Sequence, residues 1–367
     1  MNTYDRLKAQ LKAYYNAQKV ANPAWKPTVD TFTGLLEKIS KQWHLIHNFK
    51  DKLTELDGPN MPFGAASEEW ESDLSNVEDK DIEGTNALKP RYPSYYLASY
   101  SSRQAGKKFV RTRSYTELQP AMLDGDAFAE FIVDIVKKLT DSYTLWKYGA
   151  KRALLGQIAT DAIAAMGTTT TYSATTAYNA GQYVKSGTDI YVITKPKDTT
   201  NTAIADLVKA GGAVKLDLVT TLAVPTDSET GEAFIKQIKT DGEAASDVST
   251  GHSFNGNTVG AATDTGLRLY IKQGVMPSLD VDTLAGAFNQ DRLAMPAEIK
   301  VLPDFGETVD SKVYAILIDT RAARRFNNYD IALDELNADG AFRNYYRHVQ
   351  DTFAYSRNAF IKVYKAA

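Results

Sequence analysis

A single uninterrupted helical pattern, from Asp124 to about Ile158, constrains this chain more than any other feature of its 367 residues. Its apolar side chains recur at alternating steps of three and four, the period of a helix with one buried face. They are Phe128, Phe131, Ile132, Ile135, Leu139, Tyr143, Trp146, Ala150, Leu154 and Ile158. No proline interrupts the pattern, and Asp124 or Asp126 can cap its start by accepting backbone N–H bonds. At 1.5 Å per residue the helix is roughly 45–50 Å long. It is therefore either part of a coiled coil or the spine of a flat, elongated domain.

The composition allows packed cores but excludes several kinds of chemistry. With 367 residues, 43% of them apolar, two or three domains can form. The absence of cysteine excludes disulfides, thiolate catalysis and cysteine-ligated zinc. A net charge of −3 gives no overall electrostatic case for binding nucleic acid. Every apolar run falls short of the ~20 residues that a transmembrane helix needs, and the first residues lack the apolar core of a secretory signal. We therefore expect no membrane partner.

The first 60 residues are typical of an arm rather than a domain. A short amphipathic helix is expected to end near Asn22-Pro23 and to be followed by an extended link. A second helix is expected to begin near Thr28 or Asp30 and to end at Leu56. Its end is indicated by Asp57-Gly58-Pro59, because glycine and then proline commonly follow a helix C-terminus.

Residues 61–90 are unusually acidic. Eight acidic residues and only one base, Lys80, lie between positions 68 and 83: Glu68, Glu69, Glu71, Asp73, Glu78, Asp79, Asp81 and Glu83. Alternation around Trp70 and Leu74 is compatible with strands, but little apolar surface is available to bury. We interpret this segment as an extended, solvated loop whose partner lies elsewhere.

A basic segment follows the acidic one. After several tyrosines, the chain carries five bases with no acid between them: Arg103, Lys107, Lys108, Arg111 and Arg113. The surrounding residues have the two-residue period of a strand. The segment therefore predicts a basic strand immediately before the long helix.

The composition changes again at residues 166–222, which are rich in threonine, alanine and glycine. Short strands, glycine turns and a brief helix at Ala203–Ala210 are expected there, as in a small inserted module. A helix at 229–249, the strand Leu267–Lys272 and a helix from Ser278 to Ala287 follow. The remaining strands are expected at 298–302, 312–319, 329–333, 341–355 and 359–364, with a hairpin turn at Asn337–Gly340 in which Gly340 tolerates positive φ. This order, without βαβ alternation, indicates an α+β fold.

The sequence contains no recognisable catalytic pattern. His44 and His47 could share a metal ion, but no carboxylate lies at the spacing of a metalloprotease helix. Nucleophile-elbow, phosphate-loop and dinucleotide-binding motifs are absent from the sequence. Arg321, Arg324 and Arg325, expected on a short helix, could bind an anion or form ordinary ion pairs. We expect no enzyme, no cofactor and no metal.

Two C-terminal blocks resemble a known family. They are SLDVDTLAGAFNQDRLAMPAEIKVLPDFGE and KVYAILIDTRAARRFNNYDIALDELNADGAFRNYYRHVQDTFAYSRNAFIKVYKA. The features that carry the resemblance are the helix L-D-V-D-x-L-A-x-A-F-N, the turn and strand G-A-F-R-N-Y-Y-R-H-V and the final S-R-N-A-F. The blocks are similar to the C-terminal half of the major capsid proteins of small short-tailed bacteriophages (podoviruses) of the phi-29 and picovirus type. PFGAASEEWESDLS, the tyrosine-rich strands and the long helix match in order, so the resemblance covers roughly 29–165 and 223–365.

The resemblance implies the Hong Kong 97 capsid fold. In that fold a spine helix backs a peripheral domain, an axial domain points at the symmetry axes, and an arm and an extended loop reach neighbouring subunits. The corresponding parts of this chain are an N-terminal arm at 1–60, an extended loop at 61–90, a peripheral domain at 91–158 with the spine helix at 124–158, an axial domain at 159–310 that includes the β-rich insertion at about 166–222, and C-terminal strands of the peripheral domain at 311–367.

The resemblance also implies a function. The chain would be a non-enzymatic head protein of the virion that self-assembles as pentamers and hexamers into an icosahedral or prolate shell around phage double-stranded DNA. Its partners would be copies of itself, a scaffolding protein during assembly, a portal at one vertex, and packaged DNA through weak nonspecific contact. Assembly would take place in the cytoplasm of the host bacterium.

Complementary charge suggests where neighbouring subunits meet. Our hypothesis is that the acidic loop docks on the basic strand of an adjacent subunit; the alternative is that the loop is ordinary solvated surface. The interface candidates are Glu68, Glu69, Glu71, Asp73, Arg103, Lys107, Lys108, Arg111 and Arg113.

Two other functions remain open. A shell protein of an encapsulin-type compartment would share the fold but enclose cargo enzymes. A glycan-binding surface protein would use the 166–222 module, whose TTAYNAGQYVKSGTDIYVI loosely resembles chitin-binding carbohydrate modules. Tyr178, Tyr183 and Tyr191 would then stack on sugar faces; the competing interpretation gives these tyrosines a packing or interface role.

Overall fold

The structure, a computed structural model, contains two compact units. It describes residues 3–25, 51–61, 70–72, 95–97, 100–114, 125–247, 249–257, 266–275, 297–306 and 309–367. Unit 1 comprises residues 1–65, 103–151 and 325–353. Unit 2 comprises residues 66–102, 152–324 and 354–367. The predicted C-terminal strands are therefore shared between the units.

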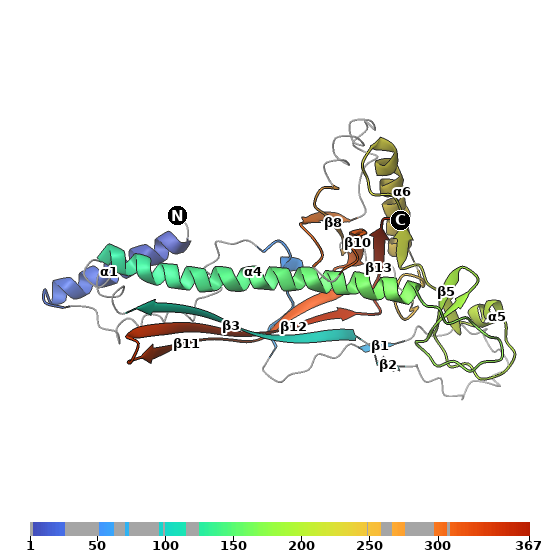
Figure 1. Ribbon diagram of the computed structural model, residues 1–367, viewed down its shortest axis with the longest axis horizontal. Coiled ribbons are helices and arrows are strands. Elements are labelled where there is room, and N and C mark those ends of the chain that lie inside the picture. Colours follow the sequence, from blue (N-terminus) through green and yellow to red (C-terminus); the bar gives the residue numbers. More distant parts are fainter. Residues whose placement is uncertain are drawn as a thin grey trace, which may run out of the picture. The chain divides into compact units, whose positions relative to one another are not determined.

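The long helix predicted from the sequence is confirmed as α4, Gly125–Met166, which has 42 residues (Figure 1). It extends eight residues beyond Ile158 because buried alanines at 159, 162 and 165 continue its apolar face. Gly167 follows the helix, and its N–H donates to the carbonyl oxygen of Ile163 with an N···O distance of 2.9 Å. Asp126 in the first turn favours the helix start, where backbone N–H groups lack partners.

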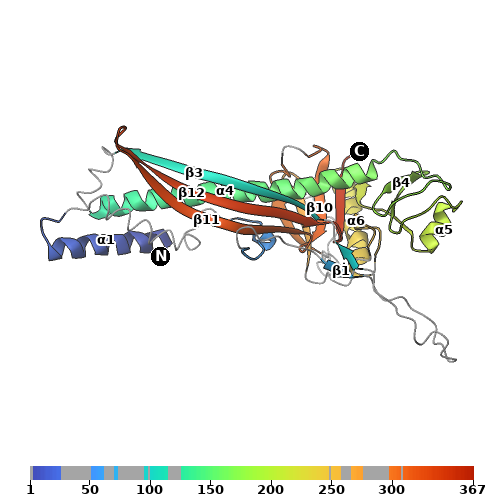
Figure 2. The ribbon, with the colours of Figure 1, turned by 90° about the horizontal axis from the view of Figure 1, so that it is seen from below.

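In unit 1 a three-stranded sheet packs along α4. The strands follow the order β11-β12-β3, with bounds Ala323–Asn337, Phe342–Ser356 and Tyr100–Ser114 (Figure 2). Alternate residues of β12 are buried from Tyr345 to Phe353, as expected for a strand with one covered face. The core cluster contains residues of α1, α4 and β12: Leu11, Tyr15, Ala129, Ile132, Ile135, Val136, Leu139 and Tyr345.

The N-terminal arm agrees with the prediction at its start and differs at its end. Helix α1, Thr3–Ala21, ends just before Asn22 as predicted. Residues 26–50 lie outside the described residues, so most of the second predicted helix stays a prediction. Its end at Leu56 is wrong, because Asp51 to Leu53 are not helical and only the 3-10 turn η2, Thr54–Leu56, follows. The Asp51 side chain instead accepts the N–H of Leu53 at 2.9 Å.

The hairpin near the C-terminus is longer than predicted. Strand β11 has 15 residues and extends well beyond the strand expected at 329–333, whereas β12, also of 15 residues, agrees with the expected length. Arg324 and Arg325 lie on β11 rather than on a short helix. In the turn, the side-chain oxygen of Asn337 accepts the N–H of Gly340 at 2.8 Å. The residue with positive φ is Ala341, at 49°, so the role predicted for Gly340 is wrong.

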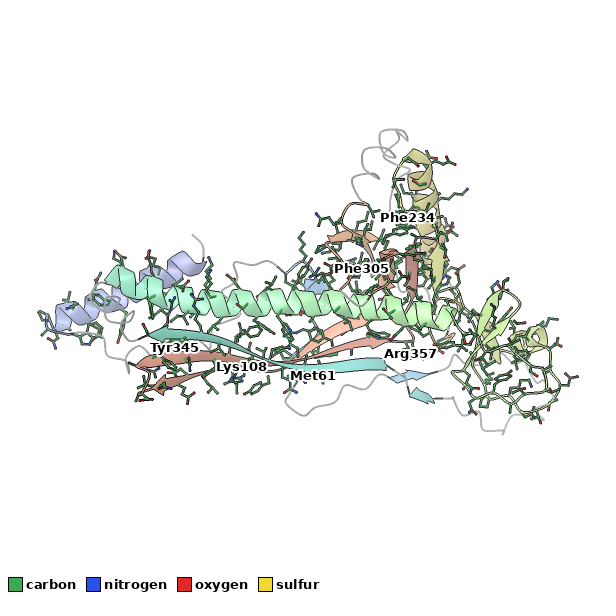
Figure 3. All side chains as sticks on the ribbon, viewed as in Figure 1. Met61, Lys108, Phe234, Phe305, Tyr345 and Arg357 are labelled. Carbon is green, nitrogen blue, oxygen red and sulfur yellow. The ribbon has the colours of Figure 1, made fainter. Side chains whose placement is uncertain are left out.

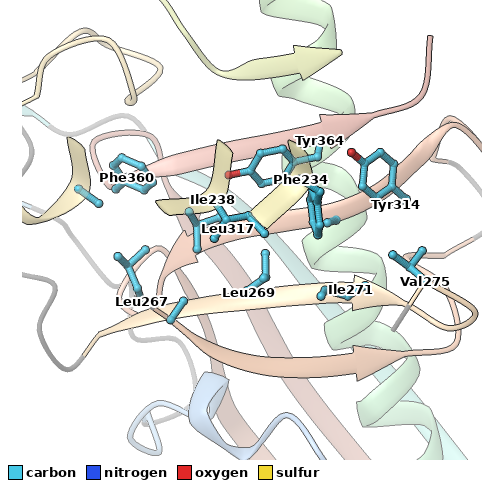
Figure 4. Packing of buried hydrophobic residues seen from close by; sticks show 13 residues of the cluster. Phe234, Ile238, Leu267, Leu269, Ile271, Val275, Tyr314, Leu317, Phe360 and Tyr364 are labelled. Carbon is cyan, nitrogen blue, oxygen red and sulfur yellow. The ribbon is translucent and has the colours of Figure 1, made fainter. Parts of the chain in front are cut away.

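Unit 2 contains a five-stranded sheet of order β7-β13-β10-β8-β9. Its strands are β7 Val219–Thr221, β8 Leu267–Lys272, β9 Glu298–Leu302, β10 Val313–Asp319 and β13 Ile361–Lys365. Every residue of the central strand β10 is buried. Helix α6, Ser228–Ser246, places Phe234 and Ile238 against Tyr314 and Tyr364 of this sheet (Figure 4). Asp227 caps α6 by accepting the N–H of Thr230 at 2.9 Å.

The predicted module has its own small sheet. Strands β4 Tyr183–Ser186, β5 Asp189–Ile193 and β6 Ala213–Lys215 pair antiparallel. The predicted brief helix is confirmed as α5, Ile204–Lys209, followed by Gly211 with φ +66°. Strand β7, at the end of the expected range, pairs with β13 of the five-stranded sheet.

Two further expectations concern the acidic loop and the region after β8. Strand β1, Trp70–Ser72, pairs antiparallel with β2, Tyr95–Leu97, of the same chain. These three residues of the loop therefore find their backbone partner within the chain, contrary to our interpretation. The helix expected at 278–287 lies outside the described residues.

No described helix is both long enough and apolar enough to cross a membrane.

A close contact in unit 2 depends on a glycine in α4. A Cβ at Gly156 would lie 2.0 Å from the carbonyl oxygen of Phe305 and 2.3 Å from Cγ2 of Val309. Any larger residue would separate α4 from the segment after β9.

We predict that Gly156→Ala lowers the free energy of unfolding by about 1–3 kcal/mol, because overpacking forces the backbone apart. The matched control is Gly149→Ala in the same helix, where a Cβ would meet no atom within 4 Å. That substitution should be neutral or stabilising by up to about 1 kcal/mol. Thermal denaturation of both variants provides the measurement, and equal midpoints would contradict the prediction.

Candidate interface surfaces and buried charge

The two arginines at the end of the basic strand are engaged within their own chain. Arg111 and Arg113 both donate through Nη2 to Oδ2 of Asp134 on α4, at 2.8 Å and 2.5 Å. The guanidinium of Arg113 also lies 5.2 Å from the ring centroid of Phe131. Both side chains therefore face α4, where they share one carboxylate.

The lysines of the same strand are exposed. Lys107 and Lys108 lie on β3, and Figure 3 labels Lys108 on the sheet. Nζ of Lys108 is 5.5 Å from the ring centroid of Tyr346 on the adjacent strand β12. Because side chains alternate along a strand, Lys108 points away from the face that carries Arg111 and Arg113. Arg103 lies at the other end of β3.

Apolar residues accompany Lys108 on the side of the sheet opposite α4, whereas the alternation places Lys107 on the face of Arg111 and Arg113. Val110 is 47% exposed, and Leu333 on β11 is 55% exposed. We call the surface formed by Lys108, Val110, Ile331, Leu333 and Tyr346 the open sheet face. It combines positive charge with uncovered apolar area.

The acidic candidates are only partly described. Glu68, Glu69 and Asp73 lie outside the described residues. Glu71 lies on β1, where its backbone stands opposite Tyr96 of β2 in the same chain. The docking of this segment on a neighbour stays a prediction.

The candidate sugar-contacting tyrosines serve packing within unit 2. Tyr178 is buried in the module core and stacks on Tyr172 with ring centroids 5.4 Å apart. The hydroxyl of Tyr183 donates to the carbonyl of Phe254 at 3.2 Å and accepts from Arg357 at 2.7 Å. Tyr191 is half-buried against the same core. Burial raises the pKa of Tyr183. This placement favours the packing interpretation over sugar stacking.

A buried lysine organises the loops of the module. Nζ of Lys197 lies within hydrogen-bonding distance of four backbone carbonyl oxygens, at 2.6, 3.2, 2.9 and 2.9 Å. They belong to Ala174, Thr176, Asp198 and Thr200. Lys197 also exchanges both backbone hydrogen bonds with Tyr178, at 2.8 and 2.9 Å. One side chain thus holds two loops together.

Unit 1 contains a second buried ammonium group. Lys151 on α4 is completely buried, and its Nζ lies 2.8 Å from Oδ2 of Asp51, 2.7 Å from the carbonyl oxygen of Leu53 and 2.8 Å from Oδ1 of Asp57. Burial alone would raise the pKa of Asp51, but the charge and hydrogen bond of Lys151 outweigh it and hold that pKa below its usual value.

An arginine extends this network to the sheet. Nη2 of Arg325 lies 2.6 Å from Oδ1 of the fully buried Asp351 and also donates to the hydroxyl of Tyr143. Nη1 of Arg325 lies 3.5 Å from Oδ1 of Asp57, which joins the arginine to the Lys151 cluster. The Arg347 guanidinium is 4.3 Å from the ring centroid of Tyr143.

Two of the three arginines that the sequence places after the strand 312–319 form ion pairs. Arg321 pairs with Asp319 at 2.5 Å, and Arg325 pairs with Asp351. The ion-pair interpretation is therefore confirmed for both. Neither Lys151 nor Asp351 was among our candidate residues, because their partners lie up to 208 positions away in the sequence.

Comparison with known proteins identifies the family. The model of the family described as Phi29-like phage major capsid protein matches residues 10–361. The chain belongs to this family. The resemblance drawn from the C-terminal motifs is thereby confirmed, and the family is one of structural proteins of phage heads.

A curated relative agrees with this family. A stretch of 93 residues, 25% of this chain, is 33% identical to the major capsid protein of Bacillus phage PZA, and it covers 20% of that protein. The match therefore spans about a fifth of the relative's length.

The fold is that of chains from phage heads. A chain of the capsid structure of Staphylococcus phage Andhra is similar, with a TM-score of 0.53 and 12% identity over 87% of this chain and 85% of that one. A chain from the structure of the head fibre and inner core protein of native bacteriophage P68 has a TM-score of 0.50 and 13% identity, over 86% of this chain and 85% of that one. At these identities the likeness concerns the fold alone.

We predict that Lys151→Met lowers the free energy of unfolding by about 3–5 kcal/mol, because it removes the fully buried cation of Asp51 and Asp57 and leaves them with cation contacts of 3.5 Å, from Lys147 and, for Asp57, Arg325. The matched control is Lys12→Met, which breaks a 2.7 Å pair with Asp126 in the same unit between side chains that are each 48% exposed. Its cost should stay below about 1 kcal/mol. Denaturant unfolding of the two variants measures the difference, and similar costs would refute the importance of the buried cluster.

The lowered pKa of Asp51 predicts a dependence on acidity. A carboxyl whose pKa is lower in the folded state stabilises the fold above its unfolded pKa of about 3.8 and loses that contribution as the pH falls through the folded value. Asp51→Asn should therefore lower the thermal midpoint at pH 7, and the deficit should shrink below about pH 4. Melting curves between pH 7 and pH 2 test this; a deficit that is constant across the range would show that ionisation plays no part.

Proposed function

We propose that this chain is the major shell subunit of a phage head, self-assembling as pentamers and hexamers into an icosahedral or prolate container for double-stranded DNA. The observation that carries the proposal is the family match over residues 10–361, joined to a fold shared with capsid chains. In the finer assignment, the fold is of the Hong Kong 97 type. Unit 1, with α4 and its sheet, corresponds to the peripheral domain, and the five-stranded sheet with α6 belongs to the axial domain. Segment 61–90 is the extended loop.

Contacts between subunits use the acidic loop and the open sheet face of a neighbour. Among the bases of β3 whose exposure the structure describes, Lys107 and Lys108 are exposed, Lys108 on the open sheet face, whereas Arg111 and Arg113 already have Asp134 as a partner. Exposed ion pairs contribute only about 0–1 kcal/mol each. Charge therefore sets register and orientation, while burial of apolar residues such as Val110 and Leu333 supplies adhesion.

The remaining partners follow from the same role. A scaffolding protein assists assembly, a portal occupies one vertex, and packaged DNA touches the shell weakly and without sequence preference. The net charge of −3 suits such contact, because a mildly acidic wall does not hold the DNA phosphates. The subunit acts without catalysis, assembles in the bacterial cytoplasm and resides in the virion.

Electron microscopy of the chain expressed with its neighbouring gene products tests the proposal. Closed shells that take up DNA support it. Shells that enclose an enzyme instead would identify an encapsulin-type compartment. A protein that stays monomeric under all conditions and is retained on chitin would identify a glycan-binding surface protein; both results would overturn the proposal.

We predict that replacing Glu68, Glu69 and Glu71 together by lysine stops or misdirects assembly, because the loop then repels the lysines of the neighbouring sheet. Sedimentation and negative-stain microscopy report the fraction of closed particles. Adding Lys107→Glu and Lys108→Glu should restore part of the assembly by recreating the attraction.

The control for that experiment changes the same charge elsewhere. Glu229, Glu232 and Glu243 are exposed on α6, and their replacement by lysine also adds six positive units. Normal shells from the loop variant, or failure of both variants alike, would contradict a specific role for the acidic loop.

A further inference from the structure

Three potential metal ligands converge in unit 2, away from the surfaces described above. One carboxylate oxygen each from Asp217 and Asp241 and one ring nitrogen of His252 lie within 4.8 Å of one another. Asp217 stands between β6 and β7, Asp241 lies on α6, and His252 belongs to the segment 249–257. The three side chains thus come from parts of the chain that are separate in sequence.

The histidine is held so that one nitrogen faces the carboxylates. His252 is 8% exposed, its ring stacks on Phe360 with centroids 4.9 Å apart, and its Nδ1 lies 2.5 Å from Oγ of Ser249. When Nδ1–H donates to that hydroxyl, Nε2 carries an unshared electron pair. Among the described residues Nε2 has no hydrogen-bond partner.

The distance across the cluster fits two ligands of one ion. Nε2 of His252 lies 3.6 Å from Oδ2 of Asp217, which is beyond an ordinary hydrogen bond. Two ligands of a tetrahedral zinc ion, each about 2.1 Å from the metal, are roughly 3.4 Å apart. A lone pair that faces a carboxylate at this separation is satisfied by a cation between them.

The net charge of the cluster is compatible with one further cation. Nζ of the fully buried Lys362 lies 2.6 Å from Oδ1 of Asp217 and 3.8 Å from Oδ1 of Asp241. One ammonium neutralises one of two carboxylates, so one negative charge remains. Lys362 approaches Oδ1 of Asp217 and leaves Oδ2 to the side of His252.

The second carboxylate, that of Asp241, is oriented by its own partners. Oδ2 of Asp241 accepts the hydroxyl of Tyr364 at 2.7 Å, and Oδ1 accepts Nε2 of Gln237 at 3.0 Å. Such outer hydrogen bonds, like that of Ser249 to His252, commonly fix the direction of metal ligands. The side chain of Asp217 is 54% exposed, so an ion can enter from solvent and keep bound water.

We propose that His252 and Asp217, with Asp241 as the third ligand, bind a divalent transition-metal ion of the zinc type. An imidazole nitrogen with carboxylates suits zinc, whereas calcium and magnesium prefer sites made of oxygen ligands. The ion joins the base of the 166–222 module, through Asp217, to α6 and to the segment 249–257. This site is independent of the interface proposed above.

Calorimetric titration of the full-length, chelator-treated protein with zinc chloride tests the site. We expect one ion per chain, a raised thermal midpoint, and visible absorption of a low-symmetry site when cobalt replaces zinc. His252→Gln should weaken binding at least tenfold. The matched control His348→Gln, on β12 in unit 1, should leave the affinity unchanged.

A second variant separates the metal site from a purely internal ion pair. Lys362→Met removes the competing ammonium, so it should lower the thermal midpoint without metal and recover at least part of the loss when zinc is added. The proposal is overturned if the unmodified chain takes up no zinc at millimolar concentration, if His252→Gln binds as well as His348→Gln, or if magnesium binds with equal affinity.

Discussion

The buried charge network between α4 and the rest of unit 1 is the interaction on which the packing of that unit depends. Apolar contact between a helix and a sheet is non-directional, so it tolerates small displacements. Buried ions do not tolerate them. A slide of α4 by one turn, about 5.4 Å, would keep many apolar contacts but would separate Lys151 from Asp51 and Asp57 and Tyr143 from Asp351. The network thus selects one register of the helix on the sheet, even though buried ion pairs add little to net stability.

Elements with a regular apolar pattern could be predicted from the sequence, whereas those that depend on the buried charge network could not. The periodicity of α4 is strong enough to identify it alone, and alanines 159, 162 and 165 carry it past the predicted end. Strand β11 was predicted too short because the first part of its covered face carries Arg325 and Asn327, which a hydrophobic pattern does not register. The non-helical conformation at Asp51 depends on a lysine 100 residues away, which no local propensity can reveal.

The candidate interface was foreseen only in part, for a similar reason. The sequence identifies a run of bases on a strand. It does not show which of these bases face α4 and pair with an acid there. Asp134 on α4 takes up Arg111 and Arg113, and the exposed lysines remain. The module tyrosines show the converse, because an aromatic side chain that could stack on a sugar stacks equally well on another ring, as Tyr178 does on Tyr172.

The four carbonyl oxygens around Nζ of Lys197 have a consequence for the module that contains them. Four carbonyl oxygens that converge on one point could coordinate a potassium ion. Here the cation is instead the ammonium group of Lys197, which is covalently attached to the chain. A covalently attached ammonium group cannot dissociate on dilution or be removed by a chelator, so the site is always occupied. The loops therefore keep their shape through the swings in ionic conditions that separate the inside of a cell from open water.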